Sequence, residues 1–410
     1  MVLILTVAFS AAGQEDKRDV RKGNRDYKKG EFAESEINFR KGIVKDSLSV
    51  AANYDLASSL YRQNKAKEAL DVLQKQTVKE LAAASEYGAD YFYNIGDAAI
   101  AVEEINAKAG ENGLKIEFKA VDDEHNGDKA VTGYDSLMDW GMQFFAGTVT
   151  TGPALAIAPY AAQDNVFMLT PSASSVDVPK AGDNIFQMCF TDPNQGASAA
   201  EVVKKYYPNA KIGVIYDSSD DYSIGLQKGF DAKAKELSLN VAVTTSFSAS
   251  TKADLSTQVE QCKSAGCDMV FMPFYYQEAA QILNYANGIG YAPAFLGCDG
   301  MDGLLTLDGF NAEVAEGLML MTPFSASNTD AATVDFVAKY KAMMNGIEPN
   351  QFAADGYDVI YAIYNACVAT GVDGNTSASD ACDTVVAYFT SNTFDGLTGT
   401  GLTWAADGTV

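Results

Sequence analysis

Two short loops rich in small hydroxyl residues are the part of this sequence best suited to chemistry. Residues 147–152 (GTVTTG) and 169–175 (LTPSASS) each follow a short apolar run, 142–145 and 166–169, that reads as a buried strand. Hydroxyls and free backbone N–H groups then stand at the carboxyl ends of two strands, the edge where open α/β sheets bind ligands. Side by side, two such loops could chelate a small carboxylate without a metal or cofactor. The alternative for either loop alone is an ordinary Ser/Thr-rich turn.

Composition narrows the class of protein. The chain has 410 residues, with 30 Lys plus Arg against 54 Asp plus Glu and a net charge of −24. That length is too great for one compact core and predicts two or three domains. Nucleic acid and anionic membrane surfaces both require a basic face, so neither is expected as a partner. No run of the sequence approaches the length needed to span a bilayer.

Histidine and cysteine usage argues against common catalytic and metal sites. His125 is the only histidine, which nearly excludes a Ser–His–Asp or Cys–His hydrolase and a histidine zinc site. The six cysteines show neither a CxxC pair nor metal spacing, and no cofactor is expected. Cys262 and Cys267 stand five apart at a predicted helix end, a spacing that we interpret as not aligning their side chains. We expect mainly buried thiols, with one disulfide possible and its pairing open.

The first 76 residues differ from the rest of the chain. Residues 1–13 form an apolar run that ends in small residues, which is typical of a signal-peptide core and therefore of export. The alternative is a buried first helix. Residues 16–76 repeat with a period of 34, so that Tyr27 recurs as Tyr61, and they resemble two tetratricopeptide (TPR) repeats. Such a segment predicts a protein-interaction module with no chemistry of its own.

From residue 97 onward, helix and strand patterns alternate. Amphipathic helices are predicted at 98–105 and 130–138. The further strands are predicted at 116–121, 212–216, 268–274 and 317–321. Alternating units of this length imply parallel sheets with helices on both faces, and their number suits two lobes. The predicted fold class is therefore α/β with an all-α helical-hairpin segment in front.

Four blocks in this region carry a resemblance to a known family. They are residues 147–175, 190–196 (FTDPNQG), 212–217 (IGVIYD) and 295–300 (FLGCDG). In order and spacing they resemble the type I periplasmic binding proteins, especially the leucine/isoleucine/valine-binding proteins of branched-chain amino acid ABC transporters. The resemblance covers about 87–410 and implies a two-lobed fold.

The resemblance also implies how the chain divides. After a junction at 77–96, lobe one would contain 87–191 and 323–401, and lobe two would contain 193–322 and 402–410. The family continues beyond this point with further strand and helix, so the C-terminus is expected to be truncated.

One departure from the family concerns the start of lobe one. Members begin with a strand and a Gly-Pro-Leu-Thr-Gly-type turn, where this chain has a helix-like run at 76–87 (QTVKELAAASEY). We therefore expect lobe one to lack its first central strand, or to improvise one from Thr77 to Leu81.

The candidate site residues follow from the same resemblance. In the family, the hydroxyl loops hold the carboxylate and head group of an amino acid through hydroxyl and backbone contacts. The matching residues here are Thr150, Thr151, Ser172 and Ser174. From lobe two, two aromatic residues close over the ligand and an acidic residue pairs with its ammonium, and the matching residues are Tyr222, Tyr275 and Asp299. Asp299 stands where the leucine-binding members carry the longer Glu, and taken alone it reads as part of an Asp-Gly turn.

The resemblance implies an extracytoplasmic substrate-binding protein of an ABC-type amino-acid transporter. It would bind a branched-chain or similar neutral amino acid by hinge closure, without catalysis, and present it to a membrane permease. The alternative is a TPR-based interaction or sensor protein with an incomplete ligand-binding domain. An enzyme on a similar fold is disfavoured, because the sequence has neither histidine partners nor a GxxxxGK[ST] phosphate loop.

Overall fold

The computed structural model describes residues 113–410 apart from 308 and 345, and a smaller part of the chain before them. That earlier part comprises 31–45, 98, 100–108 and the single positions or short runs 22, 25–27, 29, 56, 59, 60, 63 and 65. The signal-peptide-like segment 1–13, the junction 77–96 and the strand expected at Thr77–Leu81 lie outside the described residues. The chain separates into two compact units, 1–92 with 117–122, and 93–116 with 123–410.

Within the first unit, helix α2 (Phe32–Lys45) is the main described element. Phe39 on this helix is fully buried, as is Leu60, and the hydroxyls of Ser35 and Ser59 hydrogen-bond at 2.8 Å. Gln63 donates to the carbonyl of Phe32, so both Ser59 and Gln63 lie against α2.

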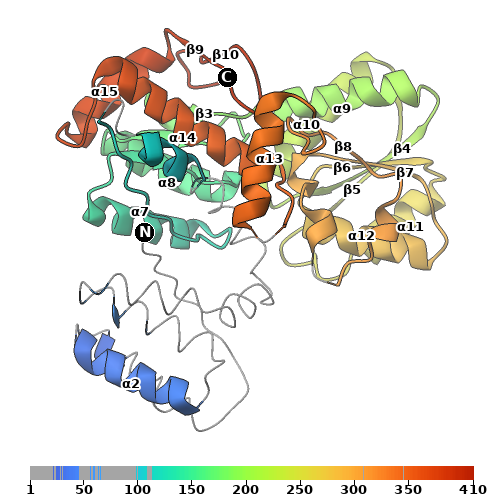
Figure 1. Ribbon diagram of the computed structural model, residues 1–410. Coiled ribbons are helices and arrows are strands. Elements are labelled where there is room, and N and C mark those ends of the chain that lie inside the picture. Colours follow the sequence, from blue (N-terminus) through green and yellow to red (C-terminus); the bar gives the residue numbers. More distant parts are fainter. Residues whose placement is uncertain are drawn as a thin grey trace. The chain divides into compact units, whose positions relative to one another are not determined.

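The larger unit consists of two α/β lobes (Figure 1). Lobe two contains a five-stranded parallel sheet in the order β5-β4-β6-β7-β8. Its strands are β4 (Lys211–Asp217), β5 (Asn240–Phe247), β6 (Met269–Met272), β7 (Ala294–Gly297) and β8 (Met319–Leu320). The central strand β6 is wholly buried, as an apolar run in a sheet covered on both faces requires.

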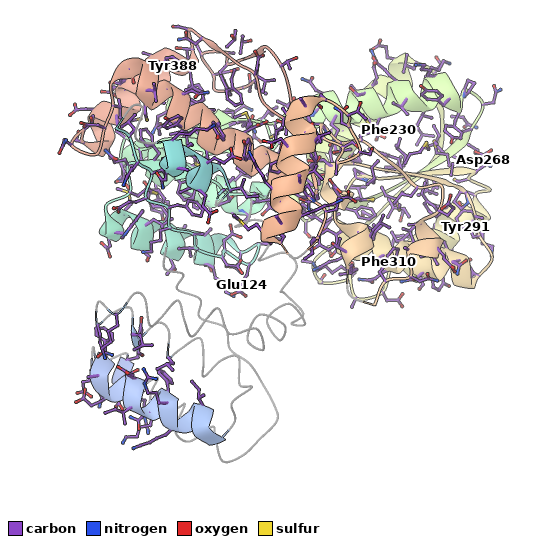
Figure 2. All side chains as sticks on the ribbon, in the orientation of Figure 1. Glu124, Phe230, Asp268, Tyr291, Phe310 and Tyr388 are labelled. Atoms are coloured by element: carbon purple, nitrogen blue, oxygen red, sulfur yellow. The ribbon has the colours of Figure 1, made fainter. Side chains whose placement is uncertain are left out.

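Helices cover both faces of the lobe-two sheet. On one face, α9 (Asp192–Tyr206) and α10 (Asp221–Glu236) share a core in which Phe230 stacks on Phe271 of β6. On the other face lie α11 (Ser256–Ser264) and α12 (Tyr276–Gly288), which pack against Val270 and Met272. Figure 2 labels Phe230 on the α9–α10 side of this sheet.

In the described part of lobe one, three parallel strands form a smaller sheet in the order β1-β2-β3. These strands are β1 (Phe144–Ala146), β2 (Phe167–Thr170) and β3 (Ile185–Gln187). Its helices are α7 (Gly127–Trp140), α8 (Thr151–Gln163), α14 (Gln351–Thr370) and α15 (Ala378–Phe389). Phe167, Phe186 and Phe389 form the aromatic centre of its core. The chain passes from β3 into α9 of lobe two and leaves lobe two after β8, towards α13 (Ala331–Met343).

The strand predicted at Ile116–Val121 is not present, and this prediction was wrong. Residues 113–121 carry no helix or strand. The amide side chain of Asn106 explains part of the difference, because it donates to the carbonyl of Ile116 and accepts from its N–H, both at 2.8 Å. Ile116 therefore has its backbone groups satisfied by a side chain instead of a neighbouring strand. Within the described residues, no strand precedes β1 in lobe one.

Residues 402–410 pack against lobe one, which corrects their predicted place in lobe two. β10 (Leu402–Thr403) pairs antiparallel with β9 (Thr393–Phe394). Trp404 is buried in the lobe-one core, 4.5 Å from the ring of Phe389, and its indole N–H donates to the carbonyl of Gln187. The N–H of Gln187 in turn donates to the carbonyl of Gly408. Burial of a large aromatic ring with its polar N–H satisfied fixes this segment on lobe one.

Candidate functional site

The two hydroxyl loops lie next to each other, as the sequence predicted. They follow β1 and β2, which are neighbours in the parallel sheet, so both loops stand at its carboxyl edge. Thr150 is the N-cap residue of α8 and Thr151 its first residue. Thr170 Oγ1 donates to the carbonyl of Thr148, and Ser172 Oγ donates to that of Val149, which ties the second loop to the first.

The four predicted hydroxyls divide into two that are satisfied and two that are not. Ser172 is bonded as above, and Thr150 Oγ1 shares a 2.8 Å hydrogen bond with Nδ1 of His125. Thr151 and Ser174 are 1% and 0% exposed, and neither hydroxyl has a hydrogen-bond partner among the described residues. Buried polar groups are normally paired, so these two are available to a bound molecule.

The lobe-two residues also gather at one edge. Tyr222 lies in the first turn of α10, Tyr275 caps α12, and Asp299 begins a short 3-10 turn, Asp299–Met301. These positions follow β4, β6 and β7, which are adjacent in the sheet. The hydroxyl of Tyr222 donates to Asp299 Oδ1 at 2.6 Å and accepts from the N–H of Gly300 at 2.9 Å. The rings of Tyr222 and Tyr275 stack with centroids 5.0 Å apart.

The two lobes meet at Tyr275. Its ring packs edge-to-face against His125 of lobe one, with centroids 5.2 Å apart. Burial raises the pKa of the Tyr275 hydroxyl well above its usual range, and the backbone N–H of Thr151 in lobe one acts in the opposite direction. The site residues predicted on separate lobes are therefore brought together around this tyrosine.

An unpredicted acidic residue, Asp192, lies in the same cluster. It is the first residue of α9, it is 1% exposed, and neither carboxylate oxygen has a hydrogen-bond partner among the described residues. Its N–H donates to the carbonyl of Ser174, and the Ser174 hydroxyl lies close enough to the carboxylate to lower its pKa, against the larger effect of burial. In one sequence an Asp before Pro193 reads only as a helix start, so no local signal identifies it.

Asp192 and Asp299 give this cluster an excess of buried negative charge. Burial raises the pKa of both carboxyls, and for Asp192 the charge of Asp299 adds to the effect. The Tyr222 hydroxyl acts in the opposite direction on Asp299. Neither carboxylate forms an ion pair with a described residue. A cation brought by a ligand would pair with charges that the protein leaves unpaired.

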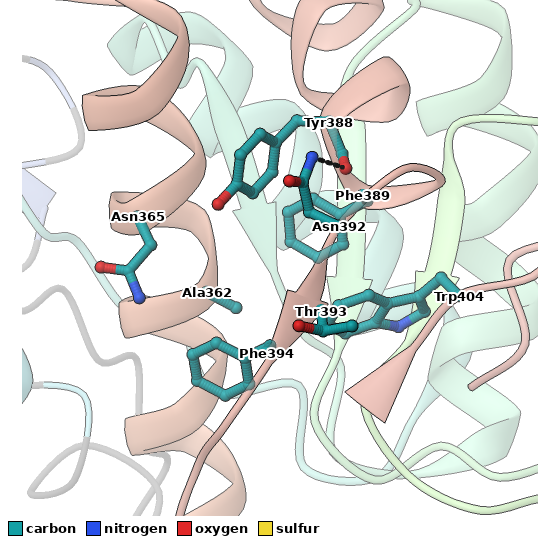
Figure 3. A pocket seen from close by; sticks show the side chains of 8 residues that line it. All are labelled: Ala362, Asn365, Tyr388, Phe389, Asn392, Thr393, Phe394 and Trp404. Carbon is teal, nitrogen blue, oxygen red and sulfur yellow. Dashed lines mark hydrogen bonds between the residues drawn. The ribbon is translucent and has the colours of Figure 1, made fainter. Parts of the chain in front are cut away.

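Other kinds of site find little support in the described part of the chain. No group of three or more His, Cys, Asp or Glu side chains there is placed to hold a metal ion. No described helix is long and apolar enough to cross a membrane. A small pocket opens in lobe one (Figure 3), lined by Ala362, Asn365, Tyr388, Phe389, Asn392, Thr393, Phe394 and Trp404. None of the predicted site residues lines it.

Comparison with known proteins defines the class. Residues 97–410 match the periplasmic binding protein family, and the chain belongs to this family. Its members are non-catalytic solute-binding proteins, so the chain is not an enzyme. The two-lobed type I fold agrees with this assignment.

Particular relatives are leucine/isoleucine/valine-binding proteins. The chain is 28% identical to Leu/Ile/Val-binding protein homolog 3 of Brucella melitensis over 269 residues, covering 65% of this chain and 71% of that protein. It is 27% identical to the Leu/Ile/Val-binding protein of Escherichia coli K12 over 240 residues, 58% of this chain and 64% of the relative.

Solved structures give the same result. The substrate-binding protein LivJ of Streptococcus pneumoniae, in complex with isoleucine, has a TM-score of 0.68 at 27% identity, covering 79% of this chain and 89% of that one. The leucine-binding protein LivK of Thermotoga maritima has a TM-score of 0.67 at 26% identity, covering 79% and 88%.

Proposed function

We propose that this protein binds a branched-chain or similar neutral amino acid between its lobes and delivers it to the permease of an ABC transporter. The observation that carries the proposal is a set of buried donors on one lobe that faces buried carboxylates on the other side. The hydroxyls of Thr151 and Ser174 and the carboxylate of Asp192 have no hydrogen-bond partner among the described residues, and the carboxylate of Asp299 accepts from the Tyr222 hydroxyl. An α-amino acid presents a carboxylate, which needs donors, and an ammonium, which needs acceptors.

Each site residue has a role in this proposal. Thr151 and Ser174 donate to the ligand carboxylate, with backbone N–H groups of the loops at Thr150 and Ser172. Asp299 accepts from the ammonium and is held for this by the Tyr222 hydroxyl. We add Asp192 as a second acceptor, because it lies beside Ser174 and has both oxygens free. The stacked rings of Tyr222 and Tyr275 form an apolar wall that suits an uncharged side chain.

Hinge closure is the proposed mechanism. Two chain crossings join the lobes, at 191–195 and near 322–324, and Gln195 in the first donates to the carbonyl of Met321 beside the second. Ligand that bridges the lobes selects the closed state, which the permease then recognises. Relatives named as leucine-binding and isoleucine-bound proteins support this ligand class. A periplasmic or other extracytoplasmic location follows from the same role.

Calorimetric titration against a panel of amino acids tests the proposal. We expect saturable binding of leucine, isoleucine or valine without turnover, and weak binding of the corresponding amino-acid amide, which lacks the carboxylate charge. Replacing Asp299 with Ala should cost about 2–5 kcal/mol of affinity, as for a buried charge partner. If no amino acid of the panel binds, the proposed function is refuted. If the amide binds as tightly as the free acid, the hydroxyl loops do not bind the ligand carboxylate.

We further propose that residues 16–76 form a TPR-like helical module for a protein partner. The hydrogen bonds of Ser59 and Gln63 to the Ser35 hydroxyl and the Phe32 carbonyl of α2 support paired helices, and Phe39 and Leu60 are both buried. Leu60→Asp should then abolish hydrogen-exchange protection in α2 while amino-acid affinity stays unchanged. Retained protection would contradict a paired-helix module.

A further inference from the structure

The end of helix α11 brings two cysteines together, contrary to the interpretation of their five-residue spacing. The N–H of Cys267 donates to the carbonyl of Cys262 at 3.0 Å, and that of Gly266 donates to Lys263 at 2.9 Å. Gly266 has a left-handed backbone with φ of +70°. These are the two bonds and the αL residue of a Schellman motif, which places the side chains at its two ends in contact. Here those ends are Cys262 and Cys267.

Strand β4 leaves room for both sulfurs at Gly213, which has no side chain. A Cβ added at Gly213 of β4 would stand 2.7 Å from Sγ of Cys262 and 3.3 Å from Sγ of Cys267. The two sulfurs therefore converge on one point of the sheet. Cys262 and Cys267 are 0% and 4% exposed, and each thiol perturbs the pKa of the other.

We propose that Cys262 and Cys267 form a disulfide when the protein meets a thiol oxidant of the disulfide class, such as oxidised glutathione. The link would close the Schellman turn between α11 and β6. It lies at the amino end of β6, whereas the ligand site lies at the carboxyl ends of the strands. Figure 2 marks this end of lobe two by Asp268 and by Tyr291, whose hydroxyl donates to the carbonyl of Cys267.

The chemistry balances as two exchanges. The Cys267 thiolate attacks the oxidant disulfide, forms a mixed disulfide and releases one thiolate. The Cys262 thiolate then attacks the Cys267 sulfur and releases the second, so that two protein thiols are oxidised and one disulfide is reduced to two thiols. Cys267 is the better first nucleophile, because the charge of Lys211 opposes the rise in its pKa, whereas burial raises the pKa of Cys262 to about 12. The protons leave with the two released thiolates.

Thiol mapping tests this assignment on the full chain. The protein is refolded in glutathione buffers of rising oxidised fraction, alkylated, digested with trypsin and chymotrypsin, and analysed by mass spectrometry. We expect one linked peptide pair containing Cys262 and Cys267, with the other cysteines alkylated. Cys267→Ser should abolish the linked pair, and Cys367→Ser, a matched change in lobe one, should retain it. Alkylation of all six cysteines at every ratio of oxidised to reduced glutathione, or a disulfide between other cysteines, would overturn the assignment.

Thermal unfolding gives a second measurement. Because the geometry is already close, the link should raise the Tm of the oxidised parent over the reduced parent by roughly 2–8 °C. Cys267→Ser should show no such difference. A link that forms but lowers the Tm would contradict the proposal that the native turn already presents the pair.

Discussion

Replacing Asp192 with Asn should weaken ligand binding and stabilise the ligand-free protein at the same time. The carboxylate is 1% exposed and unpaired, and burial holds its pKa well above the usual range. Removing the charge should therefore add about 1–3 kcal/mol to the free energy of unfolding without ligand. Losing a buried acceptor for the ammonium should cost about 2–4 kcal/mol of affinity, roughly 30- to 1,000-fold in Kd.

The sign of the pH dependence follows from the raised pKa. The folded parent binds a proton more readily than the unfolded chain, so its stability falls as pH rises through the folded pKa of Asp192. The variant lacks this group. Its advantage in stability should therefore be larger at pH 8 than at pH 5.

Two assays separate recognition from folding. Urea unfolding followed by circular dichroism measures stability, and calorimetry compares leucine with its α-hydroxy analogue, which lacks the ammonium. If Asp192 contacts the ammonium, Asp192→Asn should lower the preference for leucine over the analogue by the same factor as the affinity. A purely structural role would weaken both ligands equally and leave the preference unchanged, which would refute the reasoning.

Asp358 provides the matched control. It is an equally buried carboxylate in lobe one, and its oxygens accept from the N–H groups of Leu397 and Thr398. Asp358→Asn should destabilise the protein, because an amide cannot accept both bonds, and should leave the leucine preference intact.

Three further predictions follow from the packing of the lobes. Partial desolvation and the charge of Lys252 lower the pKa of His125, whose ring stays partly exposed at the lobe contact, so protonation should oppose closure and leucine affinity should fall as pH drops below about 6.5. In His125→Gln that fall should be smaller, and a pH profile identical to that of the parent would contradict this role of His125. Gly229→Ala would place a Cβ 2.7 Å from the carbonyl oxygen of Pro193 and should cost about 1–3 kcal/mol in urea unfolding, whereas Gly288→Ala meets no atom within 4 Å and should cost little. Amides of β1 should exchange faster than those of β4, because β1 is an edge strand among the three described strands of lobe one, whereas β4 lies inside the five-stranded sheet, and equal protection would refute this.

The sequence was sufficient to predict the parts of the site that depend on strand ends. The loops after β1 and β2 must meet if both strands are parallel neighbours, and they do. The same rule places Tyr222, Tyr275 and Asp299 after adjacent strands of lobe two. Whether each of these side chains contacts ligand remains a prediction.

Features that depend on the conformation of single residues or on hydrogen bonds between distant residues could not be predicted from the sequence. The spacing of Cys262 and Cys267 says nothing about contact until Gly266 adopts a left-handed conformation and turns the chain back. The apolar alternation of residues 116–121 predicted a strand, but the side chain of Asn106 occupies the backbone groups of Ile116. Local patterns do not record which distant group will take a hydrogen bond.

The unsatisfied groups of the site provide a reason for closure to depend on ligand. In the structure, where the two lobes are in contact at Tyr275, the hydroxyls of Thr151 and Ser174 and the carboxylate of Asp192 are buried without partners among the described residues. Each such group costs about 1–3 kcal/mol, more for a charge, so closure without ligand should be unfavourable. An amino acid supplies a carboxylate for the hydroxyls and an ammonium for the acids, and removes these costs only when both lobes contact it. A ligand shifts an equilibrium only by its differential affinity for the two states. Because the empty site is left unsatisfied when the lobes close, the closed state should be populated mainly when an amino acid is bound.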